Sequence, residues 1–531
     1  MSDQITDRRA KLEKIRALGL DPYGERFEGV IKNADVRRRI DELGIQPGQT
    51  SETETVRVAG RMVLFRDMGK LNFATLRDWT ADLQLGVSKS IVQQGWELIK
   101  LLDLGDIIGV DGRLGRTKTG EPTIWVTQLR MLSKAVRPPP EKWHGLTDVE
   151  ARYRRRYVDL LANPESQRRF VLRARIIDYI RGVLARRGFI EVDTPVLQPI
   201  YGGAAARPFT THHNTLDMKL YLRISPELYL KRCLVGGLER VYEFARCFRN
   251  EGISPRHNPE FTMLELYQAY GDYHDMMEIT EEIIAGAARD VIGSYMVGAP
   301  LPVVNAGMPA ATLQAGLSQM VREARDQAGA GLGAHVAEMF GITAIDFTPP
   351  WPRLRYADLF KQHVGLVIDD AVGIRDRATD LHRRKQIALD PAKADDAVVV
   401  SALFEHYVED KLINPTFVID YPAPLCPLTK RVPGDPRFAL RFECYIGGAE
   451  MANAYSELND PRVQHETLSA QLRGEGEETM AVMDEDFVEA LEYGMPPAGG
   501  LGIGIDRMLM MLLGSASIRE VLLFPLQRAE R

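Results

Sequence analysis

The fold is decided by the stretch Gly499-Gly500-Leu501-Gly502-Ile503-Gly504-Ile505-Asp506-Arg507. Side chains alternate between the two faces of a strand, so this spacing predicts one apolar face and one face bare of side chains. Repeated glycines on one face indicate that a ligand or another backbone comes close. Asp506 and Arg507 then open a helical segment over Met508 to Leu513. A tight joint between strand and helix is typical of the same pattern, so both interpretations remain open from this stretch alone.

Two common nucleotide-binding motifs do not fit the stretch. The third glycine of a dinucleotide fingerprint would fall at Ile505, and no Gly-Lys-Ser/Thr phosphate loop occurs in the chain. The planar guanidinium of Arg507 is nevertheless suited to a phosphate or to stacking on a ring. A flat, phosphate-bearing ligand is therefore the functional interpretation of this strand.

A second segment predicts a long hairpin. Two apolar runs, Val241 to Phe248 and Phe261 to Leu266, flank a turn rich in Gly, Ser, Pro and Asn. The turn also carries Arg249, Arg256 and His257. Guanidinium and imidazole groups suit the recognition of phosphates and bases, so the hairpin extends the expectation of a nucleotide site.

A third segment, earlier in the chain, predicts an amphipathic helix capped by Asn163 with Pro164 at its first position. The helix ends at Gly188, and a short strand then leads to Thr194-Pro195. Its predicted apolar face consists of Phe170, Ala174, Ile177, Ile180 and Leu184.

Three features of the sequence, in this order, resemble the three motifs of class II aminoacyl-tRNA synthetases. They are the helix that is followed by a proline, the hairpin that carries Phe-Arg-x-Glu, and the glycine-rich strand that ends in an arginine. Within that family the chain is most similar to the lysine-specific branch. The likeness runs from about residue 55 to Pro525, and so many ordered matches exclude chance agreement. The segments that carry it are Lys142-Trp143-His144-Gly145-Leu146-Thr147-Asp148, Arg152 to Tyr157, Gly203 to Phe209, Thr211-His212-His213-Asn214 and Tyr455 to Asp460.

Length and composition limit the number of domains and the class of protein. A chain of 531 residues with 45% hydrophobic content is typical of a globular protein with two or more domains. No apolar run reaches membrane-spanning length, the N-terminus does not read as a secretory signal, and the four cysteines form no Cys-x-x-Cys pair. The expected compartment is the cytoplasm. The net charge of −6 requires that any contact with RNA be local.

Two segments are candidates for that contact. One is the basic N-terminal helix with Arg8, Arg9, Lys11, Lys14 and Arg16, although a charge-rich helix is most often a solvated face. The other runs from about Glu54 to Val136, where five short alternating strands and a helix over Ile91 to Leu102 predict an OB barrel. By the resemblance, the anticodon is bound by Arg66, Phe73 and Gln84; the alternative for Phe73 is a place in the barrel core.

The resemblance implies an α+β chain with an N-terminal OB-fold barrel and a class II catalytic domain, whose mixed, mainly antiparallel sheet is flanked by helices. The expected parts are a helical extension (1–53), the anticodon-binding barrel (54–137), a linker with Pro138-Pro139-Pro140 (138–150) and the catalytic domain (151–531). A stretch of about 296–342, rich in Ala, Gly and Met, departs from the family. It predicts a surface insertion with a helical hairpin near Ala311 to Gln327.

The implied reaction is the ATP-dependent ligation of L-lysine to the 3′ end of tRNA(Lys) through a lysyl-adenylate. Such a transfer depends on positioning and charge stabilisation, and the resemblance makes Arg249 and Arg507 catalytic. Glu443 and Glu450 resemble the family's Mg²⁺ ligands, although two glutamates at a strand edge are usually solvated charge. The resemblance implies an ATP site of Glu251, Arg256, His257, Asn258, Phe261, Glu443, Glu450, Gly504 and Arg507.

Lysine selection requires partners for two ammonium groups. The resemblance assigns Glu227 and the Gly203 carbonyl to the α-ammonium, with Asn453 helping Arg249 on the carboxylate. It leaves Glu457 and Tyr267, with Glu265 nearby, for the ε-ammonium. Tyr455 also belongs to this pocket; it and Ala452 and Ala454 replace the more usual Phe, Gly and Gly.

Other classes of function compete with this interpretation. A paralogue that transfers lysine to a protein would lack the barrel, and a non-catalytic relative would have lost Arg249, Arg507 or the metal carboxylates. The related aspartate and asparagine enzymes need a cationic or a neutral pocket, whereas this chain offers Glu265 and Glu457. The family also implies a homodimer.

Overall fold

In the computed structural model the described residues are 2–92, 95–140, 146, 148–204, 206–299, 343–473 and 483–528. The chain divides into two compact units, residues 1–167 and 168–531, with the boundary inside helix α6 (Pro164–Arg186). Each unit has a hydrophobic core of its own. Among the described helices, none is both long and apolar enough to cross a membrane.

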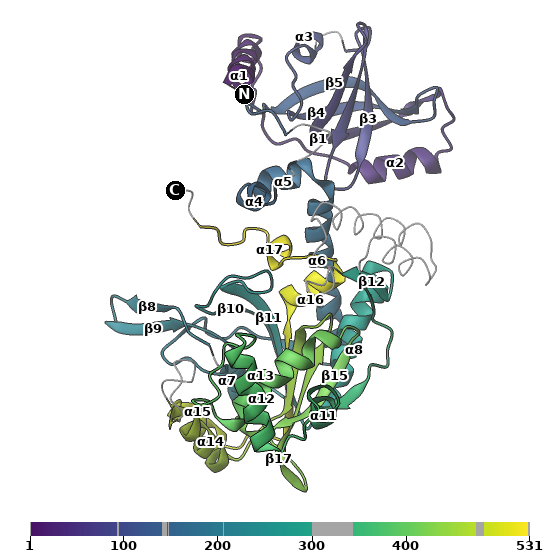
Figure 1. The fold of residues 1–531 in the computed structure, drawn as a ribbon. Coiled ribbons are helices and arrows are strands. Elements are labelled where there is room, and N and C mark those ends of the chain that lie inside the picture. Colours follow the sequence, from purple (N-terminus) through teal and green to yellow (C-terminus); the bar gives the residue numbers. More distant parts are fainter. Residues whose placement is uncertain are drawn as a thin grey trace. The chain divides into compact units, whose positions relative to one another are not determined.

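The first unit contains a closed barrel with the strand order β1-β2-β3-β5-β4 (Figure 1). The five predicted strands are present, as β1 (Thr50–Asp67), β2 (Leu71–Arg77), β3 (Asp82–Ser88), β4 (Ile107–Arg116) and β5 (Pro122–Ser133). The helix predicted over Ile91 to Leu102 is too long, because α3 is the single turn Trp96–Ile99. Its Leu98 and Ile99 still pack into the barrel core.

Four helices accompany the barrel in the described part of this unit: α1 (Ser2–Ala17), α2 (Asn33–Glu42), α4 (Val149–Arg154) and α5 (Arg156–Ala162). In α1, Arg8 donates to the carbonyls of Leu104 and Ala135 at 3.0 and 2.9 Å. Lys11 pairs with Asp103 at 2.6 Å. Two of the five basic residues considered for RNA contact therefore anchor the helix to the barrel.

The second unit is built on a sheet of nine described strands, with the order β14-β15-β17-β18-β19-β11-β10-β6 and β16 beside β17 (Figure 1). The pairs β6–β10 and β14–β15 are parallel and the other described pairs are antiparallel, which confirms the predicted mixed sheet. The strands are β6 (Ile190–Glu191), β10 (Arg240–Phe248), β11 (Glu260–Ala269), β14 (Arg353–Arg355), β15 (Thr416–Pro422), β16 (Arg431–Val432), β17 (Asp435–Tyr445), β18 (Glu450–Ser456) and β19 (Ala498–Gly504).

Helices cover this sheet and a three-stranded sheet lies beside it (Figure 1). The small sheet consists of β7 (Leu197–Gln198), β9 (Met218–Leu222) and β8 (Thr210–His213). One core joins α6, α8 and α16 to β11, β18 and β19, and another joins α11, α12 and α13 to β15 and β17. The helices are α7 (Glu227–Val235), α8 (Tyr273–Ala287), α11 (Tyr356–Val364), α12 (Ala371–Arg383), α13 (Asp396–Tyr407), α14 (Pro461–Arg473), α15 (Glu485–Glu492), α16 (Ile505–Leu512) and α17 (Ile518–Val521).

The core-facing side of α6 differs from the predicted one. Ile180 and Leu184 are buried as predicted, but the face is completed by Ile176 and Val183, and Ala174 is exposed. The predicted Phe170, Ala174 and Ile177 follow each other at spacings of four and three, so they form a second stripe beside the buried one. Pro195 also lies in an irregular segment between β6 and β7 and not in a strand.

The predicted insertion enters and leaves through one ribbon. Strand β12 (Met296–Ala299) pairs antiparallel with β13 (Thr343–Asp346). The rest of the insertion, with its predicted helical hairpin, lies outside the described residues. Of the segments that carry the resemblance, residues 142–145, Thr147 and Ala205 lie outside them too.

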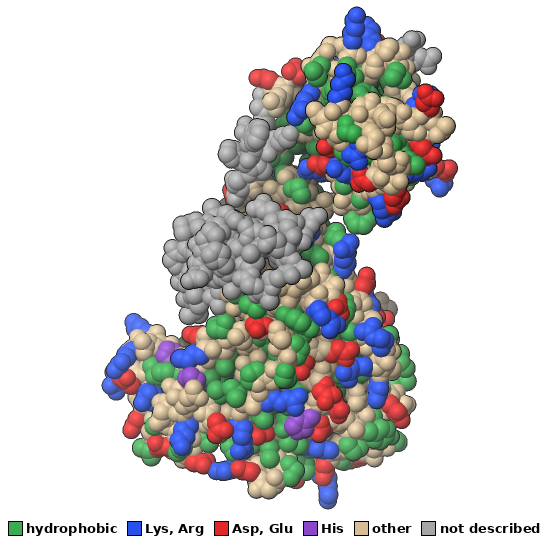
Figure 2. Space-filling model, turned by 90° about the vertical axis from the view of Figure 1, so that its right-hand side faces the viewer, with side chains coloured by type: hydrophobic (Ala, Val, Ile, Leu, Met, Phe, Trp, Pro, Cys, Tyr) green, Lys and Arg blue, Asp and Glu red, His purple; other side chains and the backbone are tan. Residues whose placement is uncertain are grey.

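The charged side chains of the surface are mixed. On the face shown in Figure 2, basic and acidic groups are interspersed over both units. This distribution agrees with a net charge of −6 and with contacts to RNA that are local.

Candidate active site

The bare face of β19 borders a cleft of about 470 Å³. Gly500, Gly502 and Gly504 line it, whereas Leu501 and Ile503 are buried on the opposite side, as the alternation predicted. A Cβ added at Gly502 would lie 3.1 Å from Met263 Cε, at the cleft wall. The strand therefore presents backbone to a cavity, which favours the ligand interpretation.

Asp506, at the start of α16, joins the three predicted motifs. Its buried carboxylate accepts hydrogen bonds from the Thr262 amide of β11 at 2.7 Å and from Arg173 of α6 at 2.6 Å. A charged acceptor inside a protein is stabilised by such donors. The helix, the hairpin and the glycine strand are therefore fastened to one another beside the cleft.

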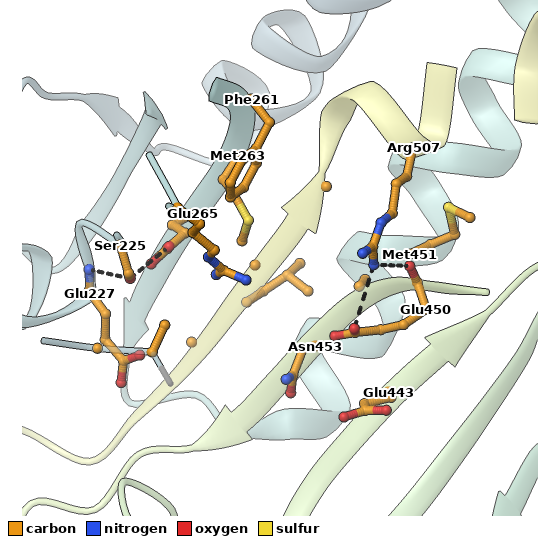
Figure 3. A pocket seen from close by; sticks show the side chains of 18 of the residues that line it. Ser225, Glu227, Phe261, Met263, Glu265, Glu443, Glu450, Met451, Asn453 and Arg507 are labelled. Atoms are coloured by element: carbon orange, nitrogen blue, oxygen red, sulfur yellow. Dashed lines mark hydrogen bonds and ion pairs between the residues drawn. The ribbon is translucent and has the colours of Figure 1, made fainter. Parts of the chain in front are cut away.

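The cleft brings together every residue predicted for ATP and lysine except Glu457. The side chains come from the hairpin, from β17 and β18, and from the starts of α7 and α16 (Figure 3). Those that line it are Gly203, Glu227, Arg249, Glu251, Arg256, His257, Asn258, Phe261, Glu265, Tyr267, Glu443, Glu450, Asn453, Tyr455, Gly504 and Arg507.

One part of the cleft is cationic. Arg507 donates to His257 Nε2 at 2.9 Å, and since a guanidinium only donates, this nitrogen accepts and the imidazole is neutral. Burial, and then the charge of Arg507, lower the pKa of His257 and of Arg256. The positive groups repel one another, so each disfavours the charged form of its neighbour. A bound phosphate would relieve this repulsion, and the site therefore suits a polyanion.

Arg249 offers an unused donor in the same cleft. Its Cζ lies 5.1 Å from the centroid of the Phe261 ring, and its buried Nε has no hydrogen-bond partner among the described residues. Asn258 similarly donates to the Glu260 carbonyl at 2.6 Å, while its buried Oδ1 has no partner in the described structure. Buried polar atoms without partners are costly, so both are suited to contact a ligand.

Glu443 and Glu450 are two carboxylates beside the cationic part, where Glu450 lies 3.6 Å from Arg507. The hydroxyls of Tyr421 and Tyr445 donate to Glu443 Oε2 at 2.9 and 2.6 Å, and Arg441 pairs with its other oxygen. Burial, and then the Glu443 charge, raise the pKa of Glu450. The sequence reasoning missed Arg441, although its position two residues before Glu443 predicts that both point to one face of the strand.

This pair fits an ion that arrives with a nucleotide. Within the described residues, no group of three or more His, Cys, Asp or Glu could hold a metal. Mg²⁺ usually keeps several waters and takes one or two carboxylates together with substrate phosphates. Two carboxylates beside a cationic polyanion site match that donor set.

The other part of the cleft contains buried carboxylates. Ser225 Oγ donates to Glu265 Oε1 at 2.9 Å and accepts from the amide of Glu227 at 3.1 Å (Figure 3). The Tyr267 hydroxyl lies 3.4 Å from Glu265 Oε2. Burial, and then the Glu227 charge, raise the pKa of Glu265 to about 8. Acidic groups held this close indicate a site for a cation.

Glu457 is fully buried and lies behind Gly500. A Cβ at Gly500 would clash with Glu457 Oε1 and lie 2.5 Å from Tyr267 Cε1. Oε1 has no hydrogen-bond partner among the described residues, and Oε2 lies 2.6 Å from Lys231 Nζ. The missing side chain at Gly500 therefore makes room for Glu457 Oε1, which packs against the backbone of β19 at a residue that lines the cleft. The sequence reasoning missed Lys231, whose spacing of four from Glu227 on α7 was the available signal.

Arg66, Phe73 and Gln84 share the outer face of the barrel. Phe73 pairs with Arg66 across β1 and β2, and Gln84 pairs with Thr75, which points the same way as Phe73. Phe73 is half-buried while Ala74 fills the interior, so the core alternative for Phe73 is wrong. Trp125, which the sequence reasoning missed, lies edge-on to Phe73 with 6.2 Å between ring centroids.

Comparison with known proteins agrees with this geometry. The family described as "tRNA synthetases class II (D, K and N)" matches residues 148–528, and the "OB-fold nucleic acid binding domain" matches residues 56–132. The chain is 46% identical to the lysine–tRNA ligase of Carboxydothermus hydrogenoformans over 99% of its own length and 98% of the relative. The corresponding enzyme of Bacillus subtilis is 43% identical over 99% and 98%, and that of Pelotomaculum thermopropionicum 47% over 99% and 95%.

The chain belongs to the class II lysine–tRNA ligases. The matched barrel distinguishes it from paralogues of this family that lack an anticodon domain. The intact arginines and carboxylates of the cleft likewise argue against a non-catalytic relative. Among the carboxylates of this lysine–tRNA ligase, Glu265 and Glu457 are buried.

The residues that depart from the usual lysine–tRNA ligase pattern lie on β18. Ala452 and Ala454 are buried in the core below the sheet. Tyr455 faces the cleft, with its ring centroid 5.5 Å from Arg441 Cζ. Its extra hydroxyl therefore sits beside the arginine that holds Glu443.

Proposed function

We propose that this enzyme ligates L-lysine to the 3′ end of tRNA(Lys) in two steps at the described cleft. The observation that carries the proposal is the division of the cleft into an acidic part around Glu265 and a cationic part around Arg256, His257 and Arg507. Lysine and a polyphosphate each find the opposite charge there, so one cavity accommodates both substrates.

In the first step, the lysine carboxylate attacks the α-phosphorus of ATP and pyrophosphate leaves. Arg249, whose Nε lacks a partner in the described structure, is assigned to the oxygens of the lysine carboxylate and the α-phosphate. Its fixed positive charge screens their repulsion and stabilises the charge that develops in the transition state. In the second step, a ribose hydroxyl of the tRNA attacks the lysyl-adenylate, so neither step needs a protein nucleophile.

The ATP contacts follow from the same division. We assign the triphosphate to Arg256, His257 and Arg507, and adenine to the ring of Phe261. A purine amino group would satisfy the free Oδ1 of Asn258, with Glu251 and the backbone at Gly504 completing the site.

Glu443 and Glu450 are proposed as ligands of Mg²⁺ bound with ATP. The ion would supply neutralising charge to the phosphate oxygens. Arg441, Tyr421 and Tyr445 hold the Glu443 carboxylate oriented for this task.

Lysine is assigned to the acidic part. Glu227 and the Gly203 carbonyl take the α-ammonium, and Asn453 and Tyr455 border its carboxylate end. The ε-ammonium is assigned to the Gly500 end of the cleft, near Glu457 Oε1, Tyr267 and Glu265. A neutral side chain would leave these buried carboxylates without a cation, which is the basis of selectivity.

Amino-acid-dependent exchange of labelled pyrophosphate into ATP tests the function directly. With each of the twenty amino acids offered separately, lysine alone is expected to drive strong exchange. Strong exchange with aspartate or asparagine, or none with lysine, would contradict the proposal.

Phe73→Ala is expected to weaken tRNA charging without affecting adenylate formation. Stacking of a base on an aromatic ring contributes roughly 1–3 kcal/mol, so the efficiency of aminoacylation should fall by roughly tenfold or more. Pyrophosphate exchange without tRNA, measured on the same preparation, should stay near wild type. Trp79→Ala, at an exposed aromatic of the same unit, is the control and should leave both activities intact. A parallel fall of exchange and charging would show that Phe73 is needed for folding.

The enzyme is expected to be a homodimer. Ile190 of β6 and Leu197 of β7 are 54% and 48% exposed, and closed two-fold pairs are the commonest assembly. Sedimentation at micromolar concentration should show the dimer, and Ile190→Asp should weaken it. Val372→Asp, at a 74% exposed position of α12, should not. A monomeric wild-type protein would contradict the assignment.

We also propose a cytoplasmic location. ATP, lysine and tRNA meet in that compartment, and the assigned reaction requires all three.

A further inference from the structure

Lys231 of α7 is a buried cation in contact with two carboxylates assigned to the substrate. Its Nζ donates to Glu227 Oε1 at 2.7 Å and lies 2.6 Å from Glu457 Oε2. The side chains of Lys231 and Glu457 are 0% exposed and that of Glu227 is 5% exposed. Lys231 therefore bridges the two ends of the lysine pocket from behind, on the side away from the cleft.

Charges in the pocket balance when substrate lysine is present. Glu227, Glu265 and Glu457 are three buried carboxylates, and Lys231 supplies one cation. The two ammonium groups of the substrate bring the cations to three, while its carboxylate goes to Arg249. Burial raises the pKa of Glu265 to about 8, so this carboxyl holds a proton near neutral pH until an ammonium group takes its place. Unpaired buried charges are costly, so the fully ionised pocket is neutralised by a ligand with two ammonium groups and not by one.

The bridge also sets the ionisation of Glu457. Burial raises the pKa of Glu457 to about 7, and Lys231 is the largest influence that opposes the rise, ahead of the weaker effect of Lys430. Burial disfavours the charge of Lys231 itself, but Glu227 and then Glu457 raise its pKa above the usual value. The ammonium therefore remains charged.

Three further groups of the described structure surround Lys231 and Glu457, and none of the three is a cation. Glu265 and Tyr267 approach from β11 and Tyr455 from β18, and the negative charges of Glu227 and Glu457 reach both tyrosines. Without Lys231, the nearest carboxylates would favour protonation of Glu457.

We propose that Lys231 is a positioning residue for lysine selection: it holds the carboxylates of Glu227 and Glu457 at a fixed separation, with Glu457 Oε1 against the backbone of Gly500 at the edge of the cleft. This inference rests on the proposed function. An internal salt bridge that merely ties α7 to β18 would give the same contacts, and the experiment must distinguish the two.

Lys231→Met is the decisive variant, with lysine-dependent pyrophosphate exchange measured from about pH 6 to pH 9. In the wild type, the KM for lysine should rise as the pH falls through about 7, where Glu457 takes up a proton. In the variant, the pKa of Glu457 moves higher, so this rise should begin at a higher pH. Near neutral pH the KM for lysine should increase roughly tenfold or more, and the difference from wild type should shrink toward pH 9. The KM for ATP should stay close to wild type.

Lys134→Met is a matched control. Lys134 is also 0% exposed and also pairs with two carboxylates, Asp103 at 2.6 Å and Asp106 at 2.8 Å, but it belongs to the barrel unit. Its removal is expected to lower stability without moving the KM for lysine or its pH dependence. Lys231→Gln, which keeps a neutral donor, should reproduce the pH shift if the Met variant does not fold.

Three results are informative. Absence of lysine-dependent exchange in the wild type would overturn the proposed function itself. An active wild type together with a Lys231→Met variant of unchanged KM and pH profile would overturn this inference alone. Loss of the folded state in both Lys231 variants, seen by circular dichroism, would make the residue a stability element and also overturn it.

Discussion

Glu457→Gln is expected to abolish most of the lysine-dependent pyrophosphate exchange while leaving the fold intact. The amide has nearly the shape of the carboxylate, but it removes the negative charge that lies against Gly500. Truncating one partner of a buried charge pair costs about 2–5 kcal/mol, which corresponds to roughly a 30- to 4000-fold loss in kcat/KM for lysine. The KM for lysine should carry most of this loss.

The control for this variant is Glu278→Gln, which removes an exposed carboxylate of α8. It should exchange pyrophosphate like the wild type. Because Glu457 also pairs with Lys231, thermal unfolding of both variants should be recorded alongside the kinetics. Equal activity of Glu457→Gln with lysine would contradict the assignment of the ε-ammonium to this residue.

Arg249→Ala is expected to lower the rate of adenylate formation at saturating substrates. Loss of one preorganised donor to a developing oxyanion costs about 10²–10³ in kcat in well-studied enzymes. Arg249→Lys should restore part of the rate, because it returns the charge without the planar fork. Single-turnover formation of lysyl-adenylate is the measurement.

Arg246→Ala provides the comparison for Arg249. Arg246 lies three residues earlier on β10, is exposed, and pairs with Glu260 at 3.4 Å. Its loss should leave adenylate formation unchanged. If both variants formed adenylate at the wild-type rate, the assignment of Arg249 to the reacting groups would be wrong.

Local patterns predicted the elements of this protein well. The alternation in β19, the hairpin of β10 and β11, and the strands of the barrel each follow from side chains within a few residues. The apolar face of α6 was predicted less well, since two apolar stripes lie side by side on that helix and the sequence does not say which one meets the core. The length of α3 was missed because apolar residues also pack from turns.

The supporting residues of the site were harder to predict. Lys231 and Glu457 are distant in sequence, and their contact depends on the packing of α7 against β10 and β11. The edge-on contact of Trp125 with Phe73 likewise depends on how the strands of the barrel pair. Motifs identify the groups that meet the substrate, whereas tertiary pairing decides which groups hold them.

The ribbon of β12 and β13 has a consequence for how this chain tolerates changes in length. Ala299 and Thr343 are paired across the ribbon, so the chain leaves the domain and re-enters it at the same place. Closing a longer loop between fixed ends costs free energy only as the logarithm of its length, about 0.6 kcal/mol per doubling. Residues can therefore be gained or lost between these two strands without altering the sheet that carries the cleft, and variation in length among related chains should concentrate at this point.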